Sequence, residues 1–191
     1  TPIKSSAASD VYKRQNKDNI MDKLIYMDNA ATTSTAPEVV SAMLPFFTEY
    51  YGNPSSVYNF AQKSKMAIED AREIIADSIG AAKSNEIYFT GGGSESDNWA
   101  LKSAAFGLRN KGNHIITTKI EHHAILNTCA YLEKNGFEIT YLDVDSEGFV
   151  SLEDVENAIT EKTILISVMF ANNEIGTIEP VSYTHLTLPT T

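Results

Sequence analysis

Segments with strand composition alternate with helical segments along most of the chain, and this alternation constrains the fold most strongly. The strand-like segments are residues 86–90, 114–118, 137–142 and 163–170. The helical segments between them are residues 94–110, 122–136 and 151–159. Strands that alternate with helices in this way predict an α/β domain with a mainly parallel sheet and flanking helices. The segment 163–170 is apolar almost throughout, which is typical of a strand covered on both faces.

The part of the chain before the alternation is predicted to be helical, with one loop. Pro37 suits the first turn of a helix, with Ser34 or Thr35 as its cap. Residues 51–58 are dense in turn-forming residues and predict a loop. Apolar positions then recur at helical spacing from residue 59 to residue 79, and Gly80 follows as a typical C-terminal glycine.

Composition narrows the class of protein and its partners. The 191 residues include 42% hydrophobic and 21% charged residues, as in a globular domain, and the formal net charge is −10. The negative charge argues against nucleic acid or an anionic membrane as the main partner. Cys129 is the one cysteine, so no internal disulfide forms, and a cytoplasmic location is expected. No apolar run reaches the roughly 18 residues of a membrane span.

The two ends of the chain do not share the patterns of the middle. Residues 1–15 lack helical and strand periodicity, and residues 181–191 form a threonine-rich string. Both resemble translated sequencing adapters, so we expect them to be non-native, with Met21 as a plausible start. The alternative is that they are ordinary disordered termini. The predicted domain is therefore residues 16–180.

A glycine-rich turn, "TGGGSES", precedes the helical segment 94–110. Ligands of parallel α/β sheets lie at the carboxyl ends of strands, and a helix amino terminus there offers free N–H groups to an anion. Gly93 and Ser94 would provide such donors without a lysine or arginine. The pattern matches neither the dinucleotide-binding nor the P-loop signature, so a tight structural turn remains the alternative.

Two other strand ends carry polar side chains. His122 and His123 follow the strand at 114–118; the pair has poor metal-ligand spacing and is interpreted as a helix cap, or else as a ring-stacking or proton-transferring group. Asn172 and Asn173 follow the strand at 163–170 and either form a turn or bind a ligand hydroxyl.

Two further features are interpreted as structural. Residues 143–154 resemble a calcium-binding EF-hand loop, but a strand precedes them, so we predict a turn followed by a helix cap in which Ser151 and Asp154 form a capping box. Cys129 lies on a predicted helix and is expected to be a buried, inert thiol.

Five motifs in order carry a family resemblance: "YMDNAATT", "YGNPSS", "FTGGGSESDN", "IEHHAILNTC" and "ANNEIGTIEP". They resemble the amino-terminal half of cysteine desulfurases of the NifS/IscS-like branch, which are pyridoxal-phosphate enzymes of the class V aminotransferase group. The resemblance covers about residues 21–180 and implies part of the large domain of a fold-type I pyridoxal-phosphate transferase.

The resemblance also implies roles for individual residues. Gly93 and Ser94 would bind the phosphate of pyridoxal 5′-phosphate, where relatives more often have threonine than Ser94. His122 would stack on the cofactor ring and act in catalytic proton transfer. Asn173 would contact the ring hydroxyl and the substrate, and Asn53 would border the site.

The implied activity is removal of sulfur from L-cysteine, which gives L-alanine and an enzyme persulfide for iron–sulfur cluster assembly. The implied partners are a second copy in a homodimer and a scaffold or sulfur-acceptor protein. The family's Schiff-base lysine, acceptor cysteine and substrate arginine lie beyond the "NNEIG" motif, so we predict that this chain is an inactive fragment. The alternatives are another class V enzyme, a selenocysteine lyase or kynureninase-like protein, and a non-catalytic phosphate-binding module.

Overall fold

The computed structural model describes residues 25–179, which fall into two compact units that divide after Leu44. The described part of the first unit contains helix α2 (Pro37–Met43), and Pro37 lies in its first turn as predicted. The predicted caps, Ser34 and Thr35, are wrong: the N-cap is Ala36, and no side chain bonds to this helix end. Proline needs no donor partner at the first position, so the helix begins without a polar cap.

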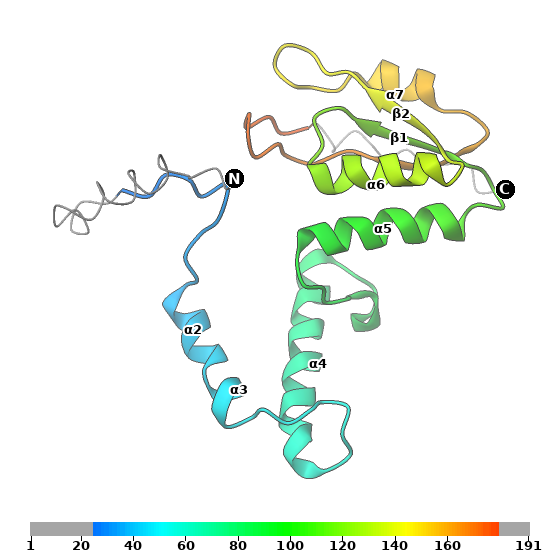
Figure 1. The fold of residues 1–191 in the computed structure, drawn as a ribbon. Helices are drawn as coiled ribbons and strands as arrows, with labels where there is room; N and C mark the ends of the chain where they lie inside the picture. Colours follow the sequence, from blue (N-terminus) through cyan, green and yellow to red (C-terminus); the bar gives the residue numbers. More distant parts are fainter. Residues whose placement is uncertain (1–24, 180–191) are drawn as a thin grey trace, which may run out of the picture. The chain divides into compact units, whose positions relative to one another are not determined.

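The second unit contains a three-stranded parallel sheet, which confirms the predicted fold class (Figure 1). Its strands are β1 (His114–Thr118), β2 (Glu138–Leu142) and β3 (Thr163–Ser167). The order β2-β1-β3 places β1 in the centre, hydrogen-bonded on both sides. Parallel neighbours require a crossover, and helices α6 (His123–Lys134) and α7 (Leu152–Ala158) provide the two crossovers.

The core consists of two clusters on opposite faces of this sheet. Ile115 and Ile116 are consecutive in β1, so their side chains point to opposite faces. Ile115 belongs to the cluster formed with α6 and with helix α5 (Gly93–Gly107), and Ile116 belongs to the cluster that includes Val155 of α7. The sheet therefore packs on both faces, but the predicted full cover of the segment 163–170 is wrong: Ile164 is its one buried residue and Phe170 is 63% exposed.

The remaining helices of the second unit precede α5. They are α3 (Pro45–Thr48), α4 (Asn59–Ile79) and the short 3₁₀ helix η2 (Ser84–Glu86). Helix α4 ends at Gly80, whose φ of 71° is left-handed, and this confirms the predicted stop. Among residues 25–179, no helix is long and apolar enough to cross a lipid bilayer.

The predicted strand at 86–90 is wrong. Glu86 ends η2, and residues 87–90 have no strand partner among the described residues. The side chain of Arg72 in α4 donates to the carbonyl of Ile87. A segment with strand composition becomes a strand only where a neighbouring strand is available to hydrogen-bond, and here a side chain takes that place. The strand predicted at 163–170 is also shorter and ends at Ser167.

The acidic segment 143–154 folds as a turn and a helix cap, as predicted, but only the Ser151 half of the predicted capping box forms among the described residues. Asp145 accepts hydrogen bonds from the amides of Glu147 (2.8 Å) and Phe149 (3.0 Å), and these bonds lower the pKa of its carboxyl group. Ser151 caps α7 by accepting from the amide of Asp154 at 3.3 Å. The Asp145 carboxylate, which lies in the first half of the calcium-like segment, therefore stabilises the turn by hydrogen bonds to its amides.

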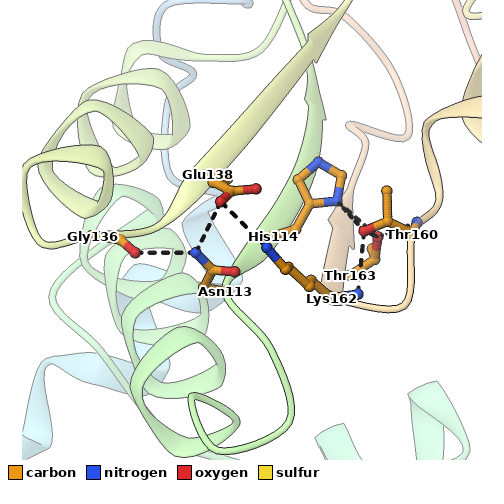
Figure 2. Close-up of polar contacts among 7 residues, drawn as sticks. All are labelled: Asn113, His114, Gly136, Glu138, Thr160, Lys162 and Thr163. Atoms are coloured by element: carbon orange, nitrogen blue, oxygen red, sulfur yellow. Dashed lines mark hydrogen bonds and ion pairs between the residues drawn. The ribbon is translucent and has the colours of Figure 1, made fainter.

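A polar cluster joins the amino ends of the three strands (Figure 2). His114 of β1 lies between β3 and β2, with its Nδ1 2.8 Å from Oγ1 of Thr163 and its Nε2 2.9 Å from Oγ1 of Thr140. Burial lowers the pKa of His114, and the Glu138 carboxylate opposes this in part. A neutral imidazole can donate one hydrogen bond and accept the other, so this histidine fits a structural role. It lies at the amino ends of the strands, whereas His122 and Asn173 follow their carboxyl ends.

Candidate functional site

The first turn of α5 presents backbone donors that no acceptor within residues 25–179 engages. The amides of Glu95 and Ser96 both donate to the carbonyl of Gly92 at 3.1 Å, whereas those of Gly93 and Ser94 are free within the described chain. Amides at the start of a helix lack partners four residues earlier and carry the positive end of the helix dipole. This turn is therefore suited to bind an anion.

The glycines of this turn leave its backbone accessible to a ligand. A Cβ added at Gly92 or Gly93 would meet no heavy atom within 4 Å, so open space lies in front of both residues. None of the three glycines has a left-handed φ. A ligand can thus approach the backbone closely here, which a side chain would hinder.

One donor of the turn is already bound. The Oε2 atom of Glu95 accepts from the amide of Gly91 at 2.5 Å. Thr90 and Ser96 are joined across the same turn, with 2.7 Å between their hydroxyl oxygens. These contacts hold the turn in shape and leave the amides of Gly92, Gly93 and Ser94 without an acceptor among residues 25–179.

His122 is the N-cap of α6. Its Nδ1 accepts a hydrogen bond from the amide of Ala124 at 3.1 Å, which confirms the capping interpretation. In the neutral ring the proton is then on Nε2, because Nδ1 acts as an acceptor. The cap fixes the ring while Nε2 and the ring faces remain available to a ligand.

A hollow of about 390 Å³ brings Ser94 and His122 together. The other residues that line it are Asn98, Lys102, His123, Ala124, Asn127, Thr128 and Tyr131. Helices α5 and α6 form its walls. Two of the four site residues predicted from the sequence, taken from different motifs, thus share one cavity.

Sequence reasoning missed the polar face of α5 that continues into this hollow. Asn98 donates to the carbonyl of Ser94 at 2.9 Å, and Lys102 donates to Oδ1 of Asn98 at 2.8 Å. The spacing of four residues from Ser94 to Asn98 to Lys102 places all three on one helix face and was the signal available. Lys102 adds a positive charge to the hollow and lies 4.8 Å from the ring centroid of Tyr131.

Asn172 and Asn173 have different environments. Asn172 is buried, and its Oδ1 accepts from the amides of Glu174 (2.8 Å) and Ile175 (3.1 Å), so it forms the turn. Asn173 is exposed and does not line the hollow shared by Ser94 and His122. The ligand role of Asn173 therefore stays a prediction, and Asn53, also exposed, stays one too.

Glu121 is a second residue that the sequence reasoning missed. Its Oε1 accepts from the amide of Met169 (2.7 Å) and from the hydroxyl of Thr118 (3.1 Å). Burial raises the pKa of this carboxyl group, and the two hydrogen bonds oppose the rise. Its position directly before His122 was the available signal.

The thiol of Cys129 lies outside the site, and the site has no metal-binding cluster within residues 25–179. Cys129 is fully buried in the core between α5 and α6, which confirms the expected burial of the thiol, and burial raises its pKa to about 11. Within residues 25–179, no three His, Cys, Asp or Glu side chains gather in a way that could hold a metal ion.

Comparisons with known proteins agree with the motif resemblance. The sequence pattern of the aminotransferase class-V family matches residues 25–185. Cysteine desulfurase IscS of Clostridium botulinum (strain Kyoto / Type A2) is 65% identical over 161 residues, which are 84% of this chain and 40% of that protein. The IscS of Methanosarcina thermophila is 61% identical over 160 residues, 84% of this chain and 39% of that protein.

Solved structures give the same result. A NifS-like protein superposes with a TM-score of 0.80 at 44% identity, over 83% of this chain and 43% of that chain. SspA in complex with cysteine superposes with a TM-score of 0.78 at 44% identity, over 83% of this chain and 45% of that chain. The chain spans about 40% of the length of the curated relatives that it matches. Because the family pattern, the curated relatives and the solved structures all match most of the chain, this protein belongs to the aminotransferase class-V family.

Proposed function

We propose that this chain is the phosphate-binding part of a pyridoxal-phosphate-dependent cysteine desulfurase. The whole protein would remove sulfur from L-cysteine and leave L-alanine and an enzyme persulfide. The observation that carries the proposal is the shared hollow, in which Ser94 at a helix amino terminus lies with the capped ring of His122. The relatives of high identity, which are named cysteine desulfurases, support the choice of reaction.

The residues present fit the cofactor. The amides of Gly93 and Ser94 and the Ser94 hydroxyl would bind the phosphate, because an anion gains most from donors that have no other partner. Lys102 would add a charge to the same hollow. The open space before Gly92 and Gly93 supports this assignment, since a Cβ there would point toward no protein atom within 4 Å.

His122 and Asn173 would orient the cofactor ring, and His122 would also hold a proton. When bound, pyridoxal phosphate supplies an electron sink for bonds at the amino-acid substrate. His122 would support the flat ring and hold a proton at Nε2, since its Nδ1 is engaged by the amide of Ala124. Asn173 would donate its side-chain amide to the ring hydroxyl.

The remaining parts of the proposal concern the whole protein. We expect it to act as a homodimer in the cytoplasm and to pass sulfur to an iron–sulfur scaffold or another acceptor protein. The chain carries no lysine in the family's Schiff-base motif, and Cys129 is buried, so we expect the 191 residues to bind the cofactor without turnover.

A titration of the chain with 4′-deoxypyridoxine 5′-phosphate tests cofactor binding. This analogue has no aldehyde and therefore cannot react with surface lysines. We expect amide resonances of Gly93, Ser94 and His122 to shift in NMR spectra, and the unphosphorylated analogue to shift them far less. Ser94→Ala should weaken binding by about tenfold, the value of one hydrogen bond to a charged group.

Ser103→Ala is the matched control, because it makes the same change on an exposed residue of the same helix. It should leave binding unchanged. Equal binding of the phosphorylated and unphosphorylated analogues, or shifts confined to other residues, would contradict the phosphate assignment.

A chimera tests the reaction. Residues 25–179 would replace the matching residues of the Clostridium botulinum relative, which supplies the rest of the protein. We expect sulfide release from L-cysteine, and a loss of most activity with His122→Ala. A folded chimera that binds the cofactor and releases no sulfide would reject the desulfurase assignment.

A further inference from the structure

Two hydrogen bonds join the loop after β1 to the loop after β3. The amide of Met169 donates to Oε1 of Glu121 at 2.7 Å, and Nδ2 of Asn172 donates to the carbonyl of Ile120 at 3.0 Å. The loop after β3 donates both bonds and the loop after β1 accepts both, and each loop contributes one side chain and one backbone group. The chain separation is 48 residues for the first bond and 52 for the second.

Both side chains are buried and make further hydrogen bonds that hold them in place. Glu121 is 7% exposed and Asn172 is 9% exposed. Glu121 also accepts from the hydroxyl of Thr118, the last residue of β1, and Asn172 also accepts from two amides of its own turn. Hydrogen bonds in a buried setting are stronger than in water, and those to a charged group are the strongest.

Each of these residues directly precedes a residue of the proposed cofactor site. Glu121 precedes His122, and Asn172 precedes Asn173. Neither Glu121 nor Asn172 lines the hollow that Ser94 and His122 share. Their side chains hydrogen-bond to the backbone of the opposite loop and so fix the two loops without contacting the ligand space.

We propose that the pair Glu121 and Asn172 is a brace that positions His122 against Asn173, so that side chains from the loops after β1 and β3 meet one ligand. Glu121 and Asn172 are positioning residues: they act through the residues that follow them. The role of the brace rests on the proposed function, whereas its mechanical coupling of the two loops does not.

Amide hydrogen exchange in the 191-residue chain tests the coupling. Glu121→Ala should speed exchange at Glu174 and Ile175, whose amides bond to Asn172 and not to Glu121. Asn172→Ala should speed exchange at Ala124, whose amide bonds to His122. We expect an increase of about tenfold at these remote amides, the value of one buried hydrogen bond. Glu121→Gln keeps an acceptor oxygen and should restore slow exchange.

The control is Glu161→Ala, which removes an exposed carboxylate near the amino end of β3, at the opposite edge of the sheet. It should change none of these rates. If Glu121→Ala speeds exchange at Met169 alone, or at all amides equally, the two loops are not coupled and the brace is rejected.

Binding of 4′-deoxypyridoxine 5′-phosphate then tests the positioning role. Glu121→Ala should weaken binding by about tenfold while Glu121→Gln stays near the parent value. Equal affinity of Glu121→Ala and parent would reject positioning even where exchange shows coupling. A parent chain that fails to bind the analogue would count against the proposed function, and the remote exchange rates would still decide the coupling.

Discussion

Cys129 is the one cysteine of the chain, so its reactivity can be measured without interference. The thiol is fully buried, and its pKa is raised from an ordinary value of 9.0 to about 11, mainly by burial. The thiolate is the reactive form, so this shift lowers the reactive fraction about hundredfold at a given pH. We expect iodoacetamide to label the folded chain at least that much more slowly than the urea-unfolded chain, with mass spectrometry as the measurement. Equal rates would show an accessible thiol.

His114 makes the stability of the sheet depend on pH. Its pKa in the folded chain lies below the ordinary value of 6.5, so the unfolded chain binds a proton more readily. The contribution of His114 is therefore complete above pH 6.5 and is lost as the pH falls below it. The facing groups are the hydroxyls of Thr140, Thr160 and Thr163 and the carboxylate of Glu138, which weakens the effect.

The measurement for His114 is the free energy of unfolding by urea between pH 7.5 and pH 5.0. The parent chain should lose stability as the pH falls through this range. His114→Gln retains hydrogen-bonding atoms without the titration, so its curve should be flatter below pH 6.5. His123→Gln, at an exposed histidine outside the cluster, is the control and should keep the parent slope. A His114→Gln curve parallel to the parent curve would contradict the assignment.

Substitution by alanine should have opposite effects on stability at two glycines near the end of α5, Gly107 and Gly112. A Cβ at Gly112 would overlap the backbone of Lys162, so the loop before β1 packs directly against the residue before β3. A Cβ at Gly107, the last residue of α5, would meet nothing within 4 Å. Gly112→Ala should cost about 1–3 kcal/mol because backbone atoms must move. Gly107→Ala should be neutral or stabilise by up to about 1 kcal/mol because alanine favours the helix.

Urea unfolding of the two variants at pH 7.5 measures this difference. Each variant is the other's control, since both add one methyl group within the same segment. Equal losses would mean that the loop before β1 is not held close to Lys162.

The elements that depend on local pattern were predictable from the sequence. Helical periodicity with a terminal glycine gave α4, and the apolar segments gave β1 and β2 nearly to the residue. The strand at 86–90 was wrong because strand formation depends on a partner that composition does not reveal. In the site, Ser94 and His122 could be predicted because each lies at the start of a helix. The position of Glu121 before His122 was visible in the sequence, but its contact was not, because its partner Met169 lies 48 residues away.

At the scale of the whole molecule, the negative charge and the proposed anion site are compatible. A net charge of −10 repels an anionic ligand at long range, but ions in solution screen that repulsion beyond about 8 Å at physiological salt. Donors in contact with the ligand are not screened in this way. The short-range geometry of α5 therefore decides anion binding, and overall charge limits the partners that approach over larger distances.

The second unit exposes an apolar stripe on α4, and this predicts self-association of the chain. Ile74 is 69% exposed, Ile79 is 68% exposed and Ile75 is 37% exposed, and at 100° per residue the three lie on one broad side of the helix. Exposed apolar patches of this kind promote association. We expect the weight-average sedimentation coefficient of the 191-residue chain to rise with concentration. The double variant Ile74→Lys with Ile79→Lys should flatten this rise and change the free energy of unfolding by less than about 1 kcal/mol, since both positions are exposed.

The control for this prediction changes charge without removing apolar surface. Asp70→Asn with Asp77→Asn, at exposed positions of the same helix, raises the net charge by the same amount as the lysine pair. It should leave the concentration dependence as in the parent chain or strengthen it. The reason is that a smaller negative net charge reduces the repulsion between copies. If both double variants suppress association equally, charge and not the apolar stripe governs it. A parent chain that sediments as a monomer at every concentration would show that the stripe is covered within the chain itself.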